Sequence, residues 1–292
     1  MKAKMSIHDL VRDRCLDSPA DAVKDFTNAI RKTYGDENLI GIFMYGSMLS
    51  QVTSTSTSFP DFFVITDGYK NIFKRWSHKI TAQALPPHIF HLQLDSGKHC
   101  KYNLLSLEQF EQETSEEAAD IYILGRFGKR VALVWWRDES ACDKLVACSA
   151  SAMDAVAGLT LRGMPDEFDL DLFMLSCLNI SYEGETRVEA ASKVGKLFAS
   201  EEVFYRKVYP ALLRRHLQAQ PLAVENPKNS FRRIDPPKQR EKARKELASF
   251  LKKSRMRGVL RWPKFLLTVE DWVDIILAKI ERTQGIRIEP SP

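Results

Sequence analysis

Residues 39–47 read LIGIFMYGS and residues 61–66 read DFFVIT, and these two stretches decide the fold of the 292-residue chain. Both are short apolar runs rich in β-branched and aromatic residues, which is typical of buried strands. The first strand ends in Gly46-Ser47, where we expect a helix to open. Backbone N–H groups and a hydroxyl at such a helix start form a natural phosphate cradle, and glycine lets a phosphate approach closely. The two stretches therefore predict either a sheet that handles phosphate groups at one edge or a strand–turn–strand without special chemistry.

Asp61 opens the second strand, where its carboxylate could hold Mg²⁺ against the same phosphates. Asp67 is the second candidate metal ligand, because it is the next acid along the chain. Six residues of straight strand would separate the two carboxylates by about 20 Å, so Asp67 can join Asp61 only if the chain bends sharply, at Gly68 for example. Otherwise Asp67 ends the strand as a turn residue. Asp95, a third acid, is explained more simply by a hairpin turn.

The rest of the N-terminal half alternates helical and strand patterns, whereas the residues after about 138 follow a helical period. We therefore predict an α+β fold, in which a mixed sheet with flanking helices is followed by an all-helical half. The expected domains are residues 1–138, 139–220 and 221–292. The other expected elements of the first half are helices 19–34 and 69–84, strands 89–94, 101–105 and 131–136, and a loop at 51–58; the later helices are 139–162, 167–179, 189–217, 237–255 and 268–284.

The net charge of +5 is unevenly distributed along the chain. Residues 228–264 carry 14 cationic and 3 acidic side chains, a net charge of +11, so the rest of the chain carries −6. Such a segment could bind an anionic bilayer or RNA, or it could be a solvated helix stabilised by pairs such as Glu241–Lys245 and Lys242–Glu246. Apolar side chains are interleaved with the cations at Phe250, Leu251, Trp262, Phe265 and Leu266.

Composition excludes several classes of protein. With 44% hydrophobic and 28% charged residues, the chain is neither disordered nor collagen-like. The five cysteines show no C-x-x-C spacing, which favours free thiols in a reducing compartment. No stretch approaches the roughly 18 apolar residues that a membrane-spanning helix needs. The N-terminal residues resemble neither a secretory signal nor a mitochondrial transit peptide.

Several motifs carry a resemblance to known proteins. The Gly46-Ser47 to Asp61 spacing resembles the nucleotidyltransferase superfamily related to DNA polymerase β. Further segments, in their order along the chain, resemble the mitochondrial-type phosphatidate cytidylyltransferases, the mitochondrial translocator assembly and maintenance protein family. The resemblance runs from about Tyr45 to Ile288. These segments are KYNLLS at 101–106, DIYILGRFGKRV at 120–131, ISYEGETRV at 180–188, KV at 193–194, YRKVYP at 205–210 and IERTQGI at 280–286.

The resemblance implies a reaction and a location. Members of the family join CTP and phosphatidic acid, with Mg²⁺, to make CDP-diacylglycerol and pyrophosphate. They combine a nucleotidyltransferase domain with a helical, winged-helix-like domain and a C-terminal region that aids membrane contact. An anionic membrane, rather than nucleic acid, is then the expected partner of residues 228–264. The expected location is peripheral, on a bacterial cytoplasmic membrane or on the matrix side of the mitochondrial inner membrane.

The resemblance and the motif chemistry together suggest roles for individual residues. Asp61 would hold Mg²⁺, Gly46 and Ser47 would hold the β- and γ-phosphates, and Lys101 would stabilise phosphate charge. No general base is required, because a phosphate nucleophile is already ionised at pH 7. The other residues expected at the nucleotide are Tyr45, Tyr182, Arg187 and Lys193, while Arg126 and Lys129 could contact a phosphate or the lipid head group.

Structural roles remain open for several of these residues. Lys101 could be a surface lysine at a strand end, and Arg187 could pair with Glu183 or Glu189. Lys193 could lie on a solvated helix face. His88, His91 and His99 lack metal-ligand spacing, which favours structural roles.

The sequence also departs from the family at three places. Glu185 stands where the family has Asp, Asn103 where it has Gly, and Met48 follows Gly-Ser where Gly is usual. Phe63 occupies the place of a second acid. Two alternatives therefore remain, namely a nucleotidyltransferase with another nucleotide or acceptor, and an inactive module that binds RNA.

Overall fold

The N-terminal part of the chain, which the sequence predicts to be a domain, contains a five-stranded mixed sheet. The computed structural model describes residues 6–49, 59–73, 76–185 and 191–268. Strand order is β3-β4-β2-β1-β5, with β2 parallel to β4 and the other pairs antiparallel. The expected strands are thereby confirmed. Their bounds are β1 Leu39–Tyr45, β2 Asp61–Thr66, β3 His88–Gln93, β4 His99–Ser106 and β5 Ala132–Trp136.

Alternating side chains give this sheet two apolar faces. Phe43 and Phe63 point to one face, where they join a core with helices α4 (Leu107–Glu113), α5 (Ile121–Phe127) and α6 (Glu139–Gly163). Met44 and Phe62 point to the other face, which α2 covers. Strands with both faces covered read as continuous apolar runs, which is why β1 and β2 were evident from the sequence. The helices of this domain are α1 Ile7–Leu16, α2 Lys24–Tyr34, α3 Trp76–Ala84, α4 Leu107–Glu113 and α5 Ile121–Phe127.

Helix α3 is shorter than the expected helix 69–84, which is a correction to the sequence interpretation. The chain from Tyr69 to Phe73 is not helical. Tyr69 is buried, and its hydroxyl accepts a hydrogen bond from the backbone N–H of Ser106 at 3.1 Å. This side chain is anchored in the core beside β4. The apolar spacing that predicted a helix from residue 69 therefore placed its start too early in the chain, because α3 begins at Trp76.

The described part of residues 139–233, which we call the second domain after the sequence prediction, consists of helices and a small sheet. Strands β6, β7 and β8 form an antiparallel sheet in the order β6-β8-β7, and the rings of Phe168 and Phe231 stack across it with centroids 5.3 Å apart. A helix, a strand, further helices and a hairpin follow one another along this part of the chain. The bounds are α6 Glu139–Gly163, β6 Glu167–Asp169, α7 Leu170–Glu183, α8 Ala191–Ser200, α9 Glu202–Ala219, β7 Ala223–Asn226 and β8 Ser230–Arg233.

The expectation of an all-helical C-terminal half is therefore wrong. Strands of three or four residues are too short to show a clear alternation of apolar and polar side chains. Residues 223–233, which lie beyond the expected boundary at 220, pair with β6 and so belong with this sheet.

The single helix expected at 189–217 is divided at Glu201 into α8 and α9. The carboxylate of Glu201 is buried between two guanidinium groups, 2.5 Å from Arg14 and 2.6 Å from Arg130. Both partners belong to the N-terminal domain, so this break is also a contact between the two domains.

Helix α6 is the core helix of the molecule. Within the described ranges it alone has the length and hydropathy of a membrane-crossing helix. However, 61% of its most apolar stretch is buried inside the protein, where it packs against α1, α5, α7 and α9. The central helix of a globular domain has the same character.

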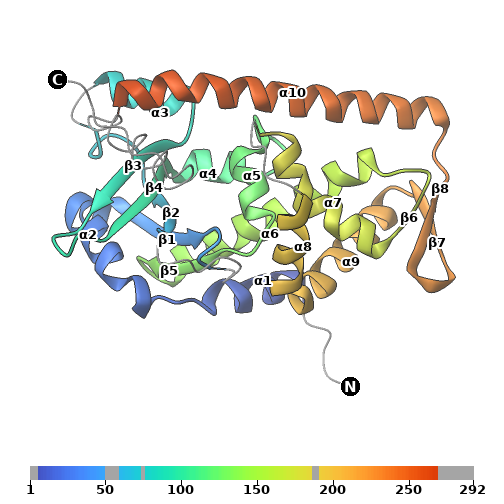
Figure 1. Cartoon of the computed structure of the whole chain (residues 1–292), viewed down its shortest axis with the longest axis horizontal. Coiled ribbons are helices and arrows are strands. Elements are labelled where there is room, and N and C mark those ends of the chain that lie inside the picture. Colours follow the sequence, from blue (N-terminus) through green and yellow to red (C-terminus); the bar gives the residue numbers. More distant parts are fainter. Residues whose placement is uncertain (1–5, 50–58, 74–75, 186–190, 269–292) are drawn as a thin grey trace.

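Helix α10, Pro237–Thr268, runs along most of the length of the molecule (Figure 1). It is longer than the expected helix 237–255. Arg240 pairs with Asp166 of the second domain at 2.6 Å, whereas Arg257 and Arg261 pair with Asp120 of the first at 2.6 and 2.7 Å. The helix therefore ties the two domains together. The expected loop 51–58 and most of the expected helix 268–284 lie outside the described residues.

Glu113 lies close to this contact and is 4% exposed. Its carboxylate accepts a hydrogen bond from the backbone N–H of Ala119 at 3.2 Å. Burial, and then the negative charge of Asp120, raise the pKa of Glu113 to about 7. Folding therefore favours the protonated carboxyl, and the stability that this supplies is lost as the pH rises from about 4.5 to about 7.

The Glu113→Gln variant should remove this pH dependence, because a neutral amide of the same shape can still accept from Ala119. Between pH 5 and pH 8 the wild-type chain should lose about 2 kcal/mol of unfolding free energy relative to the variant. Urea unfolding of both proteins at the two pH values measures the difference. Parallel changes in the two proteins would show that Glu113 ionises normally in the fold.

Candidate active site

Four chemically different side chains form a row across the sheet. Tyr45 on β1 lies opposite Asp61 on β2, Asp61 lies beside Lys101 on β4, and Lys101 lies opposite His91 on β3. Residues in register project from the same face of a sheet. Tyr45 belongs to the core on the α5 side, so the whole row faces α5. The row marks the edge where β1 ends and where β2 and β4 begin.

Gly46 brings the end of β1 directly against Asp61. It adopts φ = +90°, a conformation that side-chain-bearing residues rarely take. A Cβ atom at this position would lie 3.3 Å from Oδ2 of Asp61. We name Gly46, Ser47 and Asp61 the phosphate corner, after the role that their chemistry suggests. The structure therefore brings the sequence-predicted glycine and carboxylate together.

Where we expected a helix to begin after Gly46, residues 46–49 form a turn. The backbone N–H of Leu49 donates to the carbonyl of Gly46 at 3.1 Å, which closes a turn containing Ser47. Ser47 is exposed in this turn. A turn of this kind still presents backbone N–H groups to an anion.

Lys101 places a positive charge beside the phosphate corner. It is partly buried at the start of β4, where its backbone N–H donates to the carbonyl of Pro60 at 3.2 Å. Its register next to Asp61 is fixed by the unbroken parallel pairing of β2 with β4. An ammonium and a carboxylate side by side suit a site that binds both an anion and its counterion.

Asp67 lies at the opposite end of β2 from Asp61, so the structure does not unite the two candidate metal ligands. All six residues of β2 pair in register with β4, which keeps the strand extended. The carboxylate of Asp67 is 2.7 Å from Arg137, and its backbone N–H donates to Asn38. The bend that a shared metal ion would require is absent from β2. Asp67 therefore ends the strand in a surface ion pair.

The donor set at the corner fits a metal ion that arrives with its substrate. Among the described residues, no group of three or more His, Cys, Asp or Glu side chains is placed to hold a metal ion. Mg²⁺ is commonly bound by one or two carboxylates together with substrate phosphates and water. Asp61, beside the turn that Gly46 and Leu49 close, would satisfy that pattern with a single protein ligand.

A buried hydrogen-bond network lies behind the row. Nδ2 of Asn103 donates to the hydroxyl of Tyr45 at 2.8 Å, and the hydroxyl of Tyr122 donates to Oδ1 of Asn103 at 3.2 Å. Burial, and then the negative charge of Asp61, raise the pKa of Tyr45 well above its usual value. The phenol therefore keeps its proton and remains a donor. Sequence reasoning missed Asn103 and Tyr122, although an amide inside an apolar strand was a signal for the first.

Arg126 connects this network to the second domain. The expectation of a phosphate or head-group contact differs from what is found, since its guanidinium is buried and lies 2.5 Å from Glu185. The same guanidinium stacks on the ring of Tyr122, with its carbon 3.8 Å from the ring centroid. The positive charge of Arg126 is therefore balanced within the protein.

The second-domain candidates lie beyond Arg126. Nζ of Lys129 donates to Ser181 at 2.6 Å and sits 4.0 Å above the ring of Tyr182. Tyr182 is thus at the junction of the two domains. Lys193 is exposed on α8, and Arg187 lies outside the described residues.

His91 was interpreted as structural, yet its register places it in the row beside Lys101. Partial desolvation of the ring, and then the positive charges of Lys101 and His99, lower the pKa of His91. Its imidazole is therefore neutral near pH 7. His88 is fully buried among the rings of Phe73 and Phe90, in keeping with a structural role.

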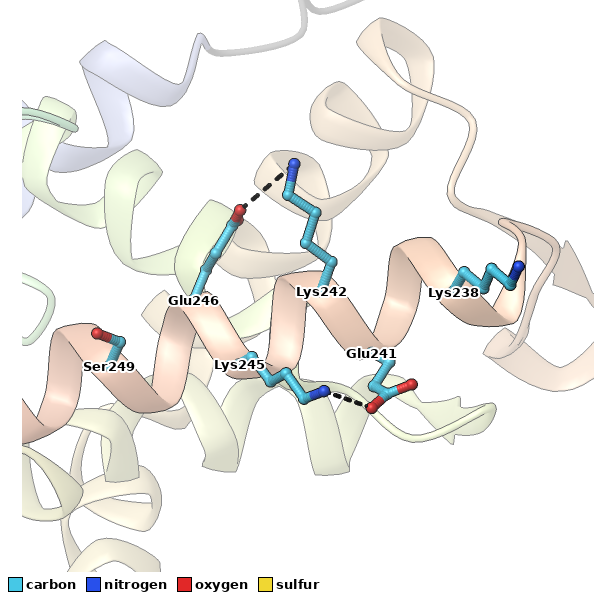
Figure 2. A pocket seen from close by; sticks show the side chains of 6 residues that line it. All are labelled: Lys238, Glu241, Lys242, Lys245, Glu246 and Ser249. Atoms are coloured by element: carbon cyan, nitrogen blue, oxygen red, sulfur yellow. Dashed lines mark ion pairs between the residues drawn. The ribbon is translucent and has the colours of Figure 1, made fainter.

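A hollow on the surface of α10 has a different character. Figure 2 shows the six side chains that line it, and all of them come from this one helix. Lys245 pairs with Glu241 at 2.6 Å and Lys242 with Glu246 at 3.9 Å, as their helical spacing predicts. This half of α10 is a solvated, charge-paired helix surface. The lining residues are Lys238, Glu241, Lys242, Lys245, Glu246 and Ser249.

Comparison with known proteins identifies the family. No curated protein matches the chain. Residues 78–267 match the family model of the mitochondrial phosphatidate cytidylyltransferases, which are nucleotidyltransferases. The match includes Lys101, the Asn103–Tyr122 network, the second domain and nearly all of α10. Because it covers well over half of the residues, the chain belongs to the mitochondrial phosphatidate cytidylyltransferase family.

Proposed function

We propose that this protein transfers the cytidylyl group of CTP to phosphatidate, forming CDP-diacylglycerol and pyrophosphate in a Mg²⁺-dependent reaction. The family supports the reaction type and both substrates. The observation that carries the proposal to particular residues is the contact of Gly46 with Asp61, in register with Lys101. This arrangement offers an anion-binding turn, a carboxylate and a cation within one edge of a sheet.

The chemistry needs positioning and charge neutralisation more than proton transfer. A phosphatidate oxygen attacks the α-phosphorus of CTP in line, a P–O bond forms, and the bond to pyrophosphate breaks. Backbone N–H groups of the turn and the hydroxyl of Ser47 would bind the β- and γ-phosphates. Lys101 would balance charge on the phosphates as it moves to the leaving group. Tyr45 would donate its phenolic hydrogen to a phosphate oxygen.

Asp61 is the residue that would hold Mg²⁺. When bound, the ion neutralises negative charge on the triphosphate and on the departing pyrophosphate. Tyr182, Arg187 and Lys193 would approach the nucleotide from the second domain.

Product formation tests the proposal directly. Purified protein is mixed with Mg²⁺, labelled CTP and vesicles containing phosphatidate, and the lipid extract is assayed for labelled CDP-diacylglycerol. We expect product with CTP and much less with ATP, GTP or UTP. Product with another nucleotide alone, transfer to RNA, or RNA binding without turnover would each overturn the assignment.

The half of α10 that lies nearest the sheet domain has a surface suited to a membrane. Met256, Val259 and Leu260 are 60%, 54% and 58% exposed, and exposed Lys252, Lys253 and Arg255 flank them on the same helix face. The opposite face carries Ser254, Arg257 and Arg261, which bind the protein interior. Cations beside an anionic bilayer contribute about 1 kcal/mol each. We therefore propose that this face rests on the lipid surface that supplies phosphatidate.

Charge reversal distinguishes vesicle binding through this face from a general effect of net charge. The triple variant Lys252→Glu, Lys253→Glu, Arg255→Glu should bind vesicles rich in phosphatidate at least about tenfold more weakly. The control Lys238→Glu, Lys242→Glu, Lys245→Glu changes the net charge equally on the other half of the helix. Vesicle sedimentation measures both variants. Equal losses would show that total charge, rather than this face, drives binding.

The family name refers to mitochondria, and a peripheral position follows from the same lipid contact. We propose the matrix side of the inner membrane in a eukaryotic cell, or the cytoplasmic membrane surface in a bacterium. Release of the protein from isolated membranes by high salt or carbonate is the expected behaviour.

A further inference from the structure

Asn103 is a buried amide whose hydrogen bonds bracket the phosphate corner. The side chain is fully buried in β4. Its Nδ2 donates to the hydroxyl of Tyr45 at 2.8 Å and to the carbonyl of Phe62 at 3.3 Å. Tyr45 immediately precedes Gly46, and Phe62 immediately follows Asp61. One amide group thus binds the chain on both sides of the Gly46–Asp61 contact.

The orientation of this amide is fixed by its partners. The carbonyl of Phe62 can only accept, so the NH₂ group must face it, and Oδ1 then faces the hydroxyl of Tyr122 at 3.2 Å. Because Nδ2 donates to the oxygen of Tyr45, the phenolic hydrogen of Tyr45 must point away from Asn103. A buried amide of this kind is costly unless its hydrogen bonds are made, so the arrangement is well defined.

Tyr122 connects Asn103 to other parts of the molecule. The centroid of its ring lies 3.8 Å from the guanidinium carbon of Arg126 and 4.6 Å from the guanidinium carbon of Arg261. Arg126 pairs with Glu185 of the second domain, and Arg261 belongs to α10. Through Tyr122, Asn103 is therefore linked both to the second domain and to α10.

We propose that Asn103 is a positioning residue for nucleotidyl transfer, which holds the Gly46–Asp61 spacing and directs the Tyr45 O–H toward a phosphate oxygen of the nucleotide. The inference rests on the proposed function. It acts through Tyr45 and the corner, so removal should weaken interactions made in the transition state more than ground-state binding.

Two variants and a matched control test the proposal. Asn103→Leu removes the amide, and Tyr45→Phe removes only the hydroxyl that it binds. Each should lower kcat about tenfold to a hundredfold, with the KM for CTP changed less than about threefold. The control Tyr102→Phe removes the hydroxyl of the adjacent tyrosine. This hydroxyl hydrogen-bonds the hydroxyl of Tyr34 at 2.8 Å on the opposite face of the sheet. The control variant should keep kcat within about twofold while losing comparable stability.

The double variant distinguishes positioning from independent damage. If Asn103 works through Tyr45, Asn103→Leu with Tyr45→Phe should lose no more than the worse single variant. Multiplied losses, full activity of Tyr45→Phe, or a kcat for Asn103→Leu equal to that of Tyr102→Phe would overturn the inference. Tyr45→Phe serves alone if Asn103→Leu does not fold.

A binding measurement separates this inference from the proposed function. If the wild-type chain makes no CDP-diacylglycerol, the proposed function fails. The rise in Tm caused by CTP with Mg²⁺ then tests the corner by itself. Because ground-state binding is expected to change little, a rise for Asn103→Leu close to that for Tyr102→Phe supports a role confined to positioning, and loss of the rise in Asn103→Leu contradicts it.

Discussion

The Asp61→Asn variant is expected to form CDP-diacylglycerol at least about 1,000-fold more slowly than the wild-type chain, with a Tm within a few degrees of it. The amide keeps the shape of the carboxylate but loses its charge, which is what Mg²⁺ requires. Asp61 lies against Gly46 at the start of β2 and is only partly buried, so the fold does not depend on that charge. Initial rates at saturating CTP and Mg²⁺ measure the loss.

Asp67→Asn is the matched control, since it makes the same change at the other end of the same strand. It removes an exposed ion pair with Arg137, which contributes less than about 1 kcal/mol, and it should leave the rate unchanged. Comparable losses in the two variants would mean that both acids serve the reaction. An active Asp61→Asn protein would remove the carboxylate from the mechanism.

Gly46→Ala is expected to lower the rate about a hundredfold for a different reason. The methyl group would lie 3.3 Å from Oδ2 of Asp61, and the residue would have to hold φ = +90°. Either the carboxylate or the turn must shift by a few tenths of an ångström. A phosphate bound to the turn would then meet Asp61 in the wrong geometry. Steady-state kinetics with CTP measure this effect.

Gly97→Ala separates backbone strain from the contact with Asp61. Gly97 has φ = +78° in the hairpin between β3 and β4, and a Cβ atom there would have nothing within 4 Å. This variant should cost about 1 kcal/mol of stability, as the corner variant does, but keep its activity. Equal activity in the two alanine variants would show that the corner tolerates a side chain.

The parts of the site that could be predicted from the sequence are local in the chain. An apolar run followed by Gly-Ser, and an acid after Pro60, each specify their own conformation, so β1, β2 and the corner were evident. The hydrogen bonds of Asn103 and the stacking of Arg126 on Tyr122 were not. They join β1, β4, α5 and the second domain, and their partners are set by packing rather than by spacing.

The basic segment shows the same division. Its helical period and its ion pairs at Lys242 and Lys245 were predictable, because i,i+4 pairs are local. The engagement of Arg257 and Arg261 with Asp120 depends on how α10 crosses the first domain. Charge counting therefore overstated the number of cations available to an external anion. Arg233 is likewise buried, in an ion pair with Asp235 at 2.6 Å.

The family match and the geometry of the corner rest on different parts of the chain. The match begins at residue 78, after Gly46 and Asp61, so it carries no information about the corner. The corner was predicted from a spacing of glycine and acid, and the sheet register then placed it beside Lys101, which lies within the match. The corner and the matched segment therefore lie on the neighbouring strands β2 and β4.

The clamp of Arg257 and Arg261 on Asp120 also bears on how the protein is made. A ribosome delivers Asp120 more than 130 residues before the arginines that neutralise it. Until then the carboxylate has no counterion in the place that the finished fold buries completely, and an uncompensated buried charge is strongly destabilising. We therefore expect the packing around Asp120, at the start of α5, to be completed only after Arg257 and Arg261 of α10 have been made.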